Sequence, residues 1–201
     1  EIAQCLVGSE MCIRDSQIGQ LREAGIDEIV IVVGYLKEKF EYLKEKYHVI
    51  LVENPYYKQM NNFSTLYVAR EYLKNTWICS ADNYFTENVF MEESENAFYA
   101  SEYADGATEE WCIKTDNTGK IIGVQIGGEN AWVMKGHVFF NEKFSTQLLP
   151  YLEEAFQKKE LWDEYWENLY MAHMDEMEMY IRKYDAGTVS YTHLTLPTTS
   201  R

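Results

Sequence analysis

Basic residues are scarce in this 201-residue chain, which has 18 Lys and Arg against 33 Asp and Glu and a formal net charge of −15. A nucleic-acid-binding protein needs a cluster of Lys and Arg to neutralise phosphates. The composition therefore disfavours that class. An anionic small-molecule substrate would have to be held locally, by a metal ion or by a few well-placed side chains.

The spacings of a zinc site or a disulfide framework are also missing. The four Cys form no C-x-x-C pair, and the four His form no H-E-x-x-H or H-x₃-H pattern. We expect reduced cysteines and a cytoplasmic protein. No apolar run approaches the ~18–20 residues of a membrane span. The first residues lack the basic start and long apolar core of a signal peptide.

The two ends differ in character from the rest of the chain. Residues 1–16 show no clear periodicity, and residues 189–201 contain no acidic residue. Both resemble translated read-through of a sequencing adapter, chiefly from Cys5 to Ser16 and from Val189 to Pro197. We therefore expect both ends to be non-native tails that pack poorly on one domain over residues 17–188. The natural protein is then expected to be longer at both ends.

The first half of that domain alternates apolar strands with amphipathic helices. A helix is predicted over 17–24, with Gly25 ending it, and Ser64 is predicted to cap another. The β-branched run at 28–33 predicts a strand buried on both faces. The further elements predicted are a helix over 37–46 and strands at 49–52 and 77–81. This order predicts a βαβαβ unit with a parallel sheet.

The second half predicts an antiparallel insertion followed by closing helices. Asn117-Thr118-Gly119 is typical of a turn between two of its strands. The predicted strands are 97–103, 111–115, 121–126, 132–140 and 177–184, and the predicted helices are 144–158 and 163–173. The fold class expected is therefore α/β with a mixed sheet.

Asp82 directly follows the predicted strand 77–81. Ligands of open α/β sheets bind outside the carboxyl ends of the strands. A carboxylate at that edge can hold a divalent cation. An ordinary Asp that opens a turn explains the same position equally well.

Several short segments together resemble the CTP:phosphocholine cytidylyltransferases, members of the nucleotidyltransferase family that also makes nucleotide sugars. The resemblance covers residues 17–188. The segments that carry it are Val33-Gly34-Tyr35-Leu36-Lys37-Glu38, Asn61-Asn62-Phe63, Ala81-Asp82-Asn83-Tyr84, Glu110-Trp111 and Tyr165-Trp166-Glu167-Asn168.

The resemblance implies a three-layer α/β/α Rossmann-like nucleotidyltransferase fold with a mixed, mostly parallel sheet. It implies the conversion of CTP and phosphocholine into CDP-choline and pyrophosphate with Mg²⁺. Asp82 matches the family's metal-binding Asp, and Mg²⁺ accepts one or two carboxylates together with phosphate oxygens. Gln59, Asn61 and Asn62 match its base-binding loop, where amides can read a base edge. As turn formers, the two Asn would need no ligand.

Three aromatic residues, Trp111, Tyr165 and Trp166, are expected to bind the acceptor. A quaternary ammonium has no N–H to donate and is best held by aromatic faces with acids nearby. The acids available are Glu110, Glu164 and Glu167. Large aromatics in strands and helices are otherwise core residues, which is the role we assign to Trp77 and Trp132.

The chain departs from the family pattern at both ends. It has no G-x-G-x-R segment, so the family's first strand and Gly-rich triphosphate loop are expected to be missing. It has no Asp or Glu after Asp185, where the family supplies a second metal carboxylate. We therefore expect a partial nucleotidyltransferase domain that is inactive by itself.

The sequence also leaves other functions open. The acceptor could be phosphoethanolamine, 2-aminoethylphosphonate or a sugar 1-phosphate. A nucleotide-sugar-dependent glycosyltransferase is a different enzyme, although Asp82-Asn83-Tyr84 imitates its D-x-D motif poorly. A non-catalytic module that captures choline-type ligands is the third class.

Overall fold

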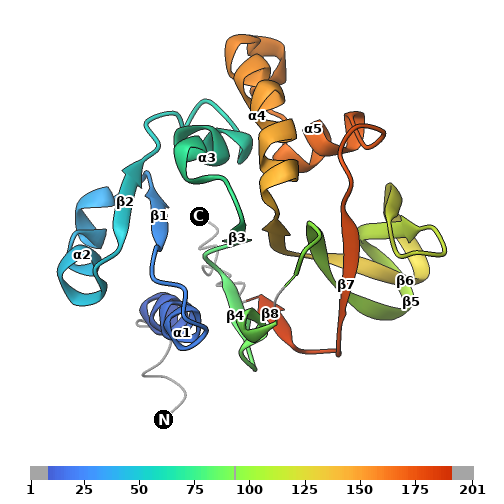
Figure 1. The fold of residues 1–201 in the computed structure, drawn as a ribbon, viewed down its shortest axis with the longest axis horizontal. Coiled ribbons are helices and arrows are strands. Elements are labelled where there is room, and N and C mark those ends of the chain that lie inside the picture. Colours follow the sequence, from blue (N-terminus) through green and yellow to red (C-terminus); the bar gives the residue numbers. More distant parts are fainter. Residues whose placement is uncertain (1–8, 93, 192–201) are drawn as a thin grey trace, which may run out of the picture.

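The protein is described by a computed structural model that covers residues 9–92 and 94–191. Figure 1 shows its arrangement. In chain order the elements are α1 (Ser9–Glu23), β1 (Val30–Val33), η2 (Lys37–Phe40), α2 (Tyr42–Tyr47), β2 (Ile50–Glu53), α3 (Phe63–Val68), η3 (Arg70–Tyr72), β3 (Thr76–Cys79), β4 (Asn83–Phe85), η4 (Val89–Met91), β5 (Phe98–Thr115), β6 (Ile121–Phe140), α4 (Glu142–Gln157), η5 (Lys159–Leu161), α5 (Trp166–Ala172), β7 (Tyr180–Tyr184) and β8 (Val189–Tyr191).

The strands pair in both directions, so the α/β architecture with a mixed sheet is confirmed. The largest set has the order β3-β6-β5-β7. β1 pairs with β2 and β5 with β7 in parallel, whereas β3–β6, β5–β6 and β4–β8 are antiparallel. In Figure 1, β1 and β2 stand at one side with α2 outside them, and the curled β5–β6 pair stands at the other.

The core lies on both faces of the central strands. On one face, α3, α4 and α5 pack against β5 and β6 through a cluster that includes Phe63, Phe140 and Leu148. On the other face, Trp77 and Cys79 of β3 pack against a second cluster formed by Phe85, Val89, Phe90 and Val189. Helices and strands thus form layers on either side of the sheet.

Several predicted elements differ from the structure. β1 and β2 pair in parallel with α2 between them, which confirms the first half of the predicted βαβαβ unit. β3 pairs antiparallel with β6, so among the described residues it does not extend that parallel pair as predicted. Because β1 has one paired neighbour there, only Val33 of this strand is buried. The predicted strands 97–103 and 111–115 are joined in β5, and the predicted strands 121–126 and 132–140 are joined in β6. Pairing between β5 and β6 continues across β-bulges through the polar residues that separate the predicted strands.

Ser64 does not cap a helix, which corrects the prediction. α3 begins at Phe63, and the Ser64 hydroxyl donates instead to the carbonyl of Asn61 at 2.8 Å. The helix stop at Gly25 is confirmed, because this residue has a φ of 78° in the left-handed region that favours glycine. Gly119 at φ 86° likewise confirms the turn between β5 and β6.

Parts of both predicted tails contact the domain. α1 begins at Ser9, and Asp15 pairs with Lys46 at 2.9 Å. The expectation of poor packing is wrong for Val189, which is 2 % exposed and whose backbone N–H donates to the Glu102 carboxylate at 2.8 Å. The assignment of residues 1–16 and 189–201 as non-native stays a prediction, and residues 1–8 and 192–201 lie outside the described part.

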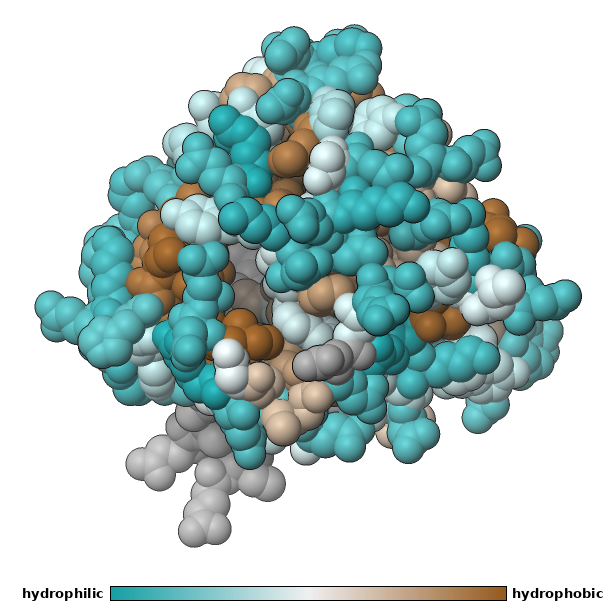
Figure 2. All heavy atoms as spheres, viewed as in Figure 1, coloured by the Kyte–Doolittle hydropathy of each residue, from teal (hydrophilic) through white to brown (hydrophobic). Residues whose placement is uncertain are grey.

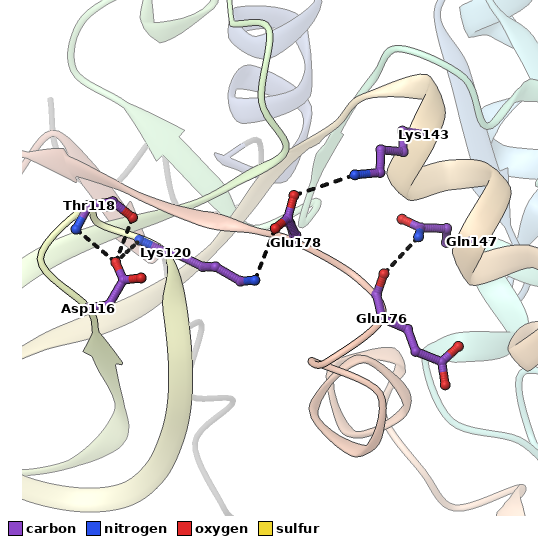
Figure 3. A network of polar contacts seen from close by, with 7 residues as sticks. All are labelled: Asp116, Thr118, Lys120, Lys143, Gln147, Glu176 and Glu178. Carbon is purple, nitrogen blue, oxygen red and sulfur yellow. Dashed lines mark hydrogen bonds and ion pairs between the residues drawn. The ribbon is translucent and has the colours of Figure 1, made fainter.

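A polar network ties the β5–β6 turn to α4 by way of the approach to β7 (Figure 3). The Lys120 ammonium lies 3.0 Å from one oxygen of Glu178, and the Lys143 ammonium lies 3.4 Å from the other. The Gln147 amide donates to the carbonyl of Glu176 at 2.7 Å. These exposed contacts fix the hairpin turn against the helical layer.

The face of the molecule seen in Figure 2 is mainly hydrophilic, and one hydrophobic area lies over β1 and β2. A net charge of −15 agrees with this surface. Among the described residues, no helix combines the length and apolar character needed to cross a membrane.

Candidate functional site

An open aromatic corner is formed by Trp111 of β5 and Tyr165, the residue that precedes α5. Their ring centroids lie 6.0 Å apart with an angle of 78° between the ring planes. Tyr165 is 46 % exposed and Trp111 is partly buried. Two perpendicular rings at a solvent-accessible position present the geometry that a bulky cation needs.

A second Trp–Tyr pair shows by contrast what the corner lacks. Tyr103 and Trp132 have ring centroids 5.4 Å apart with an interplanar angle of 65°, and Tyr103 is 43 % exposed. Here the protein supplies its own cation, because the Lys183 ammonium lies 4.7 Å from the centre of a Trp132 ring. Within the described part of the chain, no Lys or Arg is recorded over Trp111 or Tyr165.

Trp166, predicted with the other two aromatics, lies elsewhere. It is 5 % exposed and stacks on Tyr99 at 6.0 Å with an interplanar angle of 12°. Phe140 packs against its edge at 5.1 Å. Tyr165 and Trp166 are consecutive, so one ring faces solvent while the other enters the core. The structure gives Trp166 a packing position and leaves the corner to Trp111 and Tyr165.

Glu167, in the first turn of α5, carries a carboxylate that is held by neutral groups. The Tyr99 hydroxyl donates to one oxygen at 3.2 Å, and the Asn62 amide donates to the other at 3.1 Å. Burial raises the pKa of this carboxyl above its usual value, and the hydrogen bonds from Asn62, its own backbone and Tyr99 oppose that rise. No basic side chain of the described residues forms an ion pair with it.

Sequence reasoning named Glu167 only as one of three available acids and missed Tyr99. An apolar strand predicts a buried tyrosine ring but not the partner of its hydroxyl. The signal that was present is the position of Glu167, two residues after Tyr165 at a helix start, where a carboxylate is favoured by free backbone N–H groups.

The loop that carries Gln59, Asn61 and Asn62 is bonded to the segment leading into α5. The Asn61 amide donates to the carbonyl of Asp163 at 2.9 Å, and the Asn62 side-chain oxygen accepts from the backbone N–H of Trp166 at 2.8 Å. Gln59 differs from both, because its side chain is exposed. The side chains of Asn61 and Asn62 thus form hydrogen bonds within the protein, whereas the exposed side chain of Gln59 is available to a ligand.

Asp82 lies in an exposed turn between β3 and β4, as predicted. The buried Asn83 holds this turn, because its side chain accepts from the backbone N–H of Ser80 at 2.9 Å and donates to the carbonyl of Lys135 at 3.2 Å. Among the described residues, no group of three or more Asp, Glu, His or Cys is placed to hold a metal ion. Asp82 therefore offers a single carboxylate.

Known proteins resemble this chain over most of its length, although no family model matches it. The choline-phosphate cytidylyltransferase of Streptococcus pneumoniae is 33 % identical over 173 residues, which cover 86 % of this chain and 76 % of that enzyme. The chain belongs to the choline-phosphate cytidylyltransferase family of nucleotidyltransferases. The chain is also similar to a 2-aminoethylphosphonate cytidylyltransferase of Lancefieldella rimae, with 31 % identity over 88 % of this chain and 73 % of the relative.

Solved structures agree with this family assignment. The CTP:phosphocholine cytidylyltransferase of S. pneumoniae superposes with a TM-score of 0.83 and 32 % identity, covering 88 % of this chain and 78 % of that one. A putative glucose-1-phosphate thymidylyltransferase of Bacillus anthracis gives a TM-score of 0.65 at 12 % identity, over 86 % of this chain and 74 % of its own. The second likeness shows the nucleotidyltransferase fold alone.

We predict that Glu167→Gln stabilises the fold at pH 7. The folded-state pKa of Glu167 lies above its ordinary value of 4.5, so ionisation destabilises the folded state as the pH rises through that range. A glutamine stays neutral and keeps an oxygen for Asn62. The gain should shrink as the pH falls to 4.5 and below, which urea unfolding across pH would measure.

Glu154→Gln is the matched control, because Glu154 is exposed and its hydrogen bond to Lys158 lowers its pKa. This variant should give no gain at pH 7. A Glu167→Gln protein that is no more stable than the parent at pH 7 would contradict the description of Glu167 as a partly buried carboxylate held by neutral donors.

Proposed function

We propose that this chain carries the acceptor site and the base-binding loop of an enzyme that transfers CMP from CTP to phosphocholine, or to a related aminoalkyl phosphate or phosphonate, and releases pyrophosphate. Its sequence has no G-x-G-x-R loop for the triphosphate, so we expect the chain to be inactive by itself. The observation that carries the proposal is the open corner of Trp111 and Tyr165, in a chain of the cytidylyltransferase family. A corner with one exposed and one partly buried aromatic ring, over which the described residues place no Lys or Arg, suits a trimethylammonium group. A sugar 1-phosphate has no cation to place there.

In this reaction an oxygen of the acceptor phosphate attacks the α-phosphorus of CTP. The bond from that phosphorus to the oxygen bridging the β-phosphate breaks, and pyrophosphate leaves with that oxygen. Such reactions depend mainly on positioning and on charge neutralisation. Trp111 and Tyr165 hold the ammonium end of the acceptor, which fixes the direction in which its phosphate points.

We propose that the cofactor is Mg²⁺ and that Asp82 is its one protein carboxylate. The exposed Asp82 offers one carboxylate, and Mg²⁺ is commonly held by one or two carboxylates with substrate phosphates and water. When bound, the ion neutralises phosphate charge. Gln59, Asn61 and Asn62 are the residues we propose to face the nucleotide base, with Gln59 making the side-chain contact. CTP is a cytoplasmic metabolite, so the enzyme is proposed to act in the cytoplasm.

A primary ammonium is the second candidate acceptor group, because one relative is a 2-aminoethylphosphonate cytidylyltransferase. A primary ammonium would donate hydrogen bonds to a carboxylate. Glu167, two residues after Tyr165 in the sequence, could supply one. The aromatic corner favours the methylated cation, since its methyl groups gain from contact with two rings.

We expect Asp82→Ala to remove most of the CDP-choline synthesis, because loss of a metal ligand typically costs several kcal/mol of transition-state stabilisation. Pyrophosphate release from CTP and phosphocholine with Mg²⁺ measures this. The sequence lacks the G-x-G-x-R loop expected to hold the triphosphate, so the assay uses a form of the protein to which such a loop has been added. Asp105→Ala, at another exposed Asp, should leave the rate unchanged. Activity of Asp82→Ala within tenfold of the parent would refute the metal assignment.

Trp111→Ala should weaken phosphocholine binding by about tenfold, because one aromatic face contributes roughly 0.5–2 kcal/mol to holding a desolvated cation. Titration followed by tryptophan fluorescence or NMR gives the affinity. Trp132→Ala is the matched control, since Trp132 lies in a similar Trp–Tyr pair that already has Lys183. Equal losses in the two variants, or equal affinities for phosphocholine and phosphoethanolamine, would argue against the aromatic corner as the acceptor site.

A further inference from the structure

One amide side chain connects the predicted nucleotide loop to the acceptor corner. Asn62 and Glu167 are 105 residues apart in the chain, yet the Asn62 amide nitrogen lies 3.1 Å from a Glu167 oxygen. The Asn62 oxygen accepts the backbone N–H of Trp166 at 2.8 Å. Both atoms of the amide are therefore used on the first turn of α5.

The side chain of Asn62, and not that of the N-cap residue, accepts a hydrogen bond from the first turn of α5. Tyr165 occupies that position, and its side chain makes no capping hydrogen bond. The first N–H groups of a helix need acceptors. Because Asn62 supplies one from a different segment, Tyr165 can turn its ring outward to the corner it shares with Trp111.

The same amide stabilises the charged form of Glu167. Burial favours the neutral carboxyl, while donated hydrogen bonds favour the carboxylate. The donors are Asn62 from the loop and Tyr99 from β5, with the backbone N–H of Glu167 itself. Tyr99 is the titratable group that faces Glu167 from a packed element, and the described residues place no charged side chain in ion-pair contact with it.

We infer that Asn62 and Tyr99 are positioning residues for the acceptor: they hold Glu167 as the counter-ion of the substrate ammonium, and Asn62 also orients Tyr165. This inference rests on the proposed function. It gives Asn62 a role beyond the nucleotide contact predicted from the sequence. Neither residue needs to touch the acceptor, since each acts through Glu167 or Tyr165.

An amide suits this position better than a carboxylate. Aspartate at residue 62 could accept the Trp166 N–H but could not donate to Glu167, and it would place a second negative charge beside the first. Asparagine does both with neutral atoms. For Tyr99, phenylalanine keeps the ring that stacks on Trp166 and removes only the hydroxyl.

The test is the affinity for choline, which has no group that titrates between pH 4 and 8 (roughly) and so reports on the protein alone. Choline is titrated by NMR into the parent, Asn62→Ala and Tyr99→Phe across that range. We expect each variant to bind choline about three- to tenfold more weakly at pH 7, in line with the loss of a hydrogen bond to a charged group. The pH at which affinity is half lost should also rise, because both changes raise the pKa of Glu167.

Asn88→Ala provides a matched control for lost stability. The Asn88 amide donates to the Glu23 carboxylate at 3.1 Å and accepts the backbone N–H of Phe90 at 3.1 Å, which is the same pair of bonds at another helix start. This variant should lose comparable stability and keep both the affinity and the pH profile of the parent.

The possible failures can be told apart. If the parent binds choline and phosphocholine but the affinity and pH profile are unchanged in both variants, the positioning role is refuted while the proposed function stands. If Asn62→Ala does not fold, Tyr99→Phe decides alone. If the parent binds neither ligand, the proposed function fails and this inference fails with it.

Discussion

A partly buried carboxylate, with which no Lys or Arg of the described residues forms an ion pair, governs the candidate site. Glu167 is held by an amide and a hydroxyl, both neutral. Such an arrangement costs stability, because burial disfavours the ionised form and neutral donors offset only part of that cost. The cost is understandable if a ligand supplies the missing positive charge. The hydrogen bonds that Asn62 and Tyr99 donate to Glu167 are explained by this constraint.

The two Trp–Tyr pairs show how one structural motif serves two purposes. In both pairs, the rings meet at a steep angle and the tyrosine is about half exposed. Lys183 covers Trp132 and makes that pair part of the sheet surface. In the pair at Trp111, Tyr165 is exposed while Trp111 packs partly against the core, and no Lys or Arg of the described residues lies over either ring. The net charge of −15 favours the binding of a cation over that of an anion. For the phosphate end of the acceptor and for the triphosphate, the positive charge is proposed to come from a Mg²⁺ ion at Asp82.

Much of the fold was predictable from local patterns, and the exceptions have physical reasons. Gly25 and Gly119 ended elements as expected because left-handed φ values are a local property of glycine. The pairing of β3 with β6 could not be read from β3, since a short apolar run fits parallel and antiparallel neighbours equally. The bulged hairpin was missed because its polar middle lacks a strand pattern, although its backbone groups are paired.

The sequence predicted which residues belong to the candidate site better than it predicted the role of each. Trp111 and Tyr165 were identified through the family resemblance, and the structure brings them together. Trp166 shared that resemblance but entered the core, because consecutive residues at a helix start point in different directions. Asn62 was predicted from its amide chemistry, whereas its partner across the fold depends on tertiary contacts that a sequence pattern does not contain.

The most direct measurement is the set of intermolecular nuclear Overhauser effects between the methyl protons of bound phosphocholine and the aromatic rings. We predict contacts to the rings of Trp111 and Tyr165 and none to Tyr103 or Trp132. Contacts to Tyr103 and Trp132 in place of the first pair, or contacts to no ring while phosphocholine is bound, would contradict it.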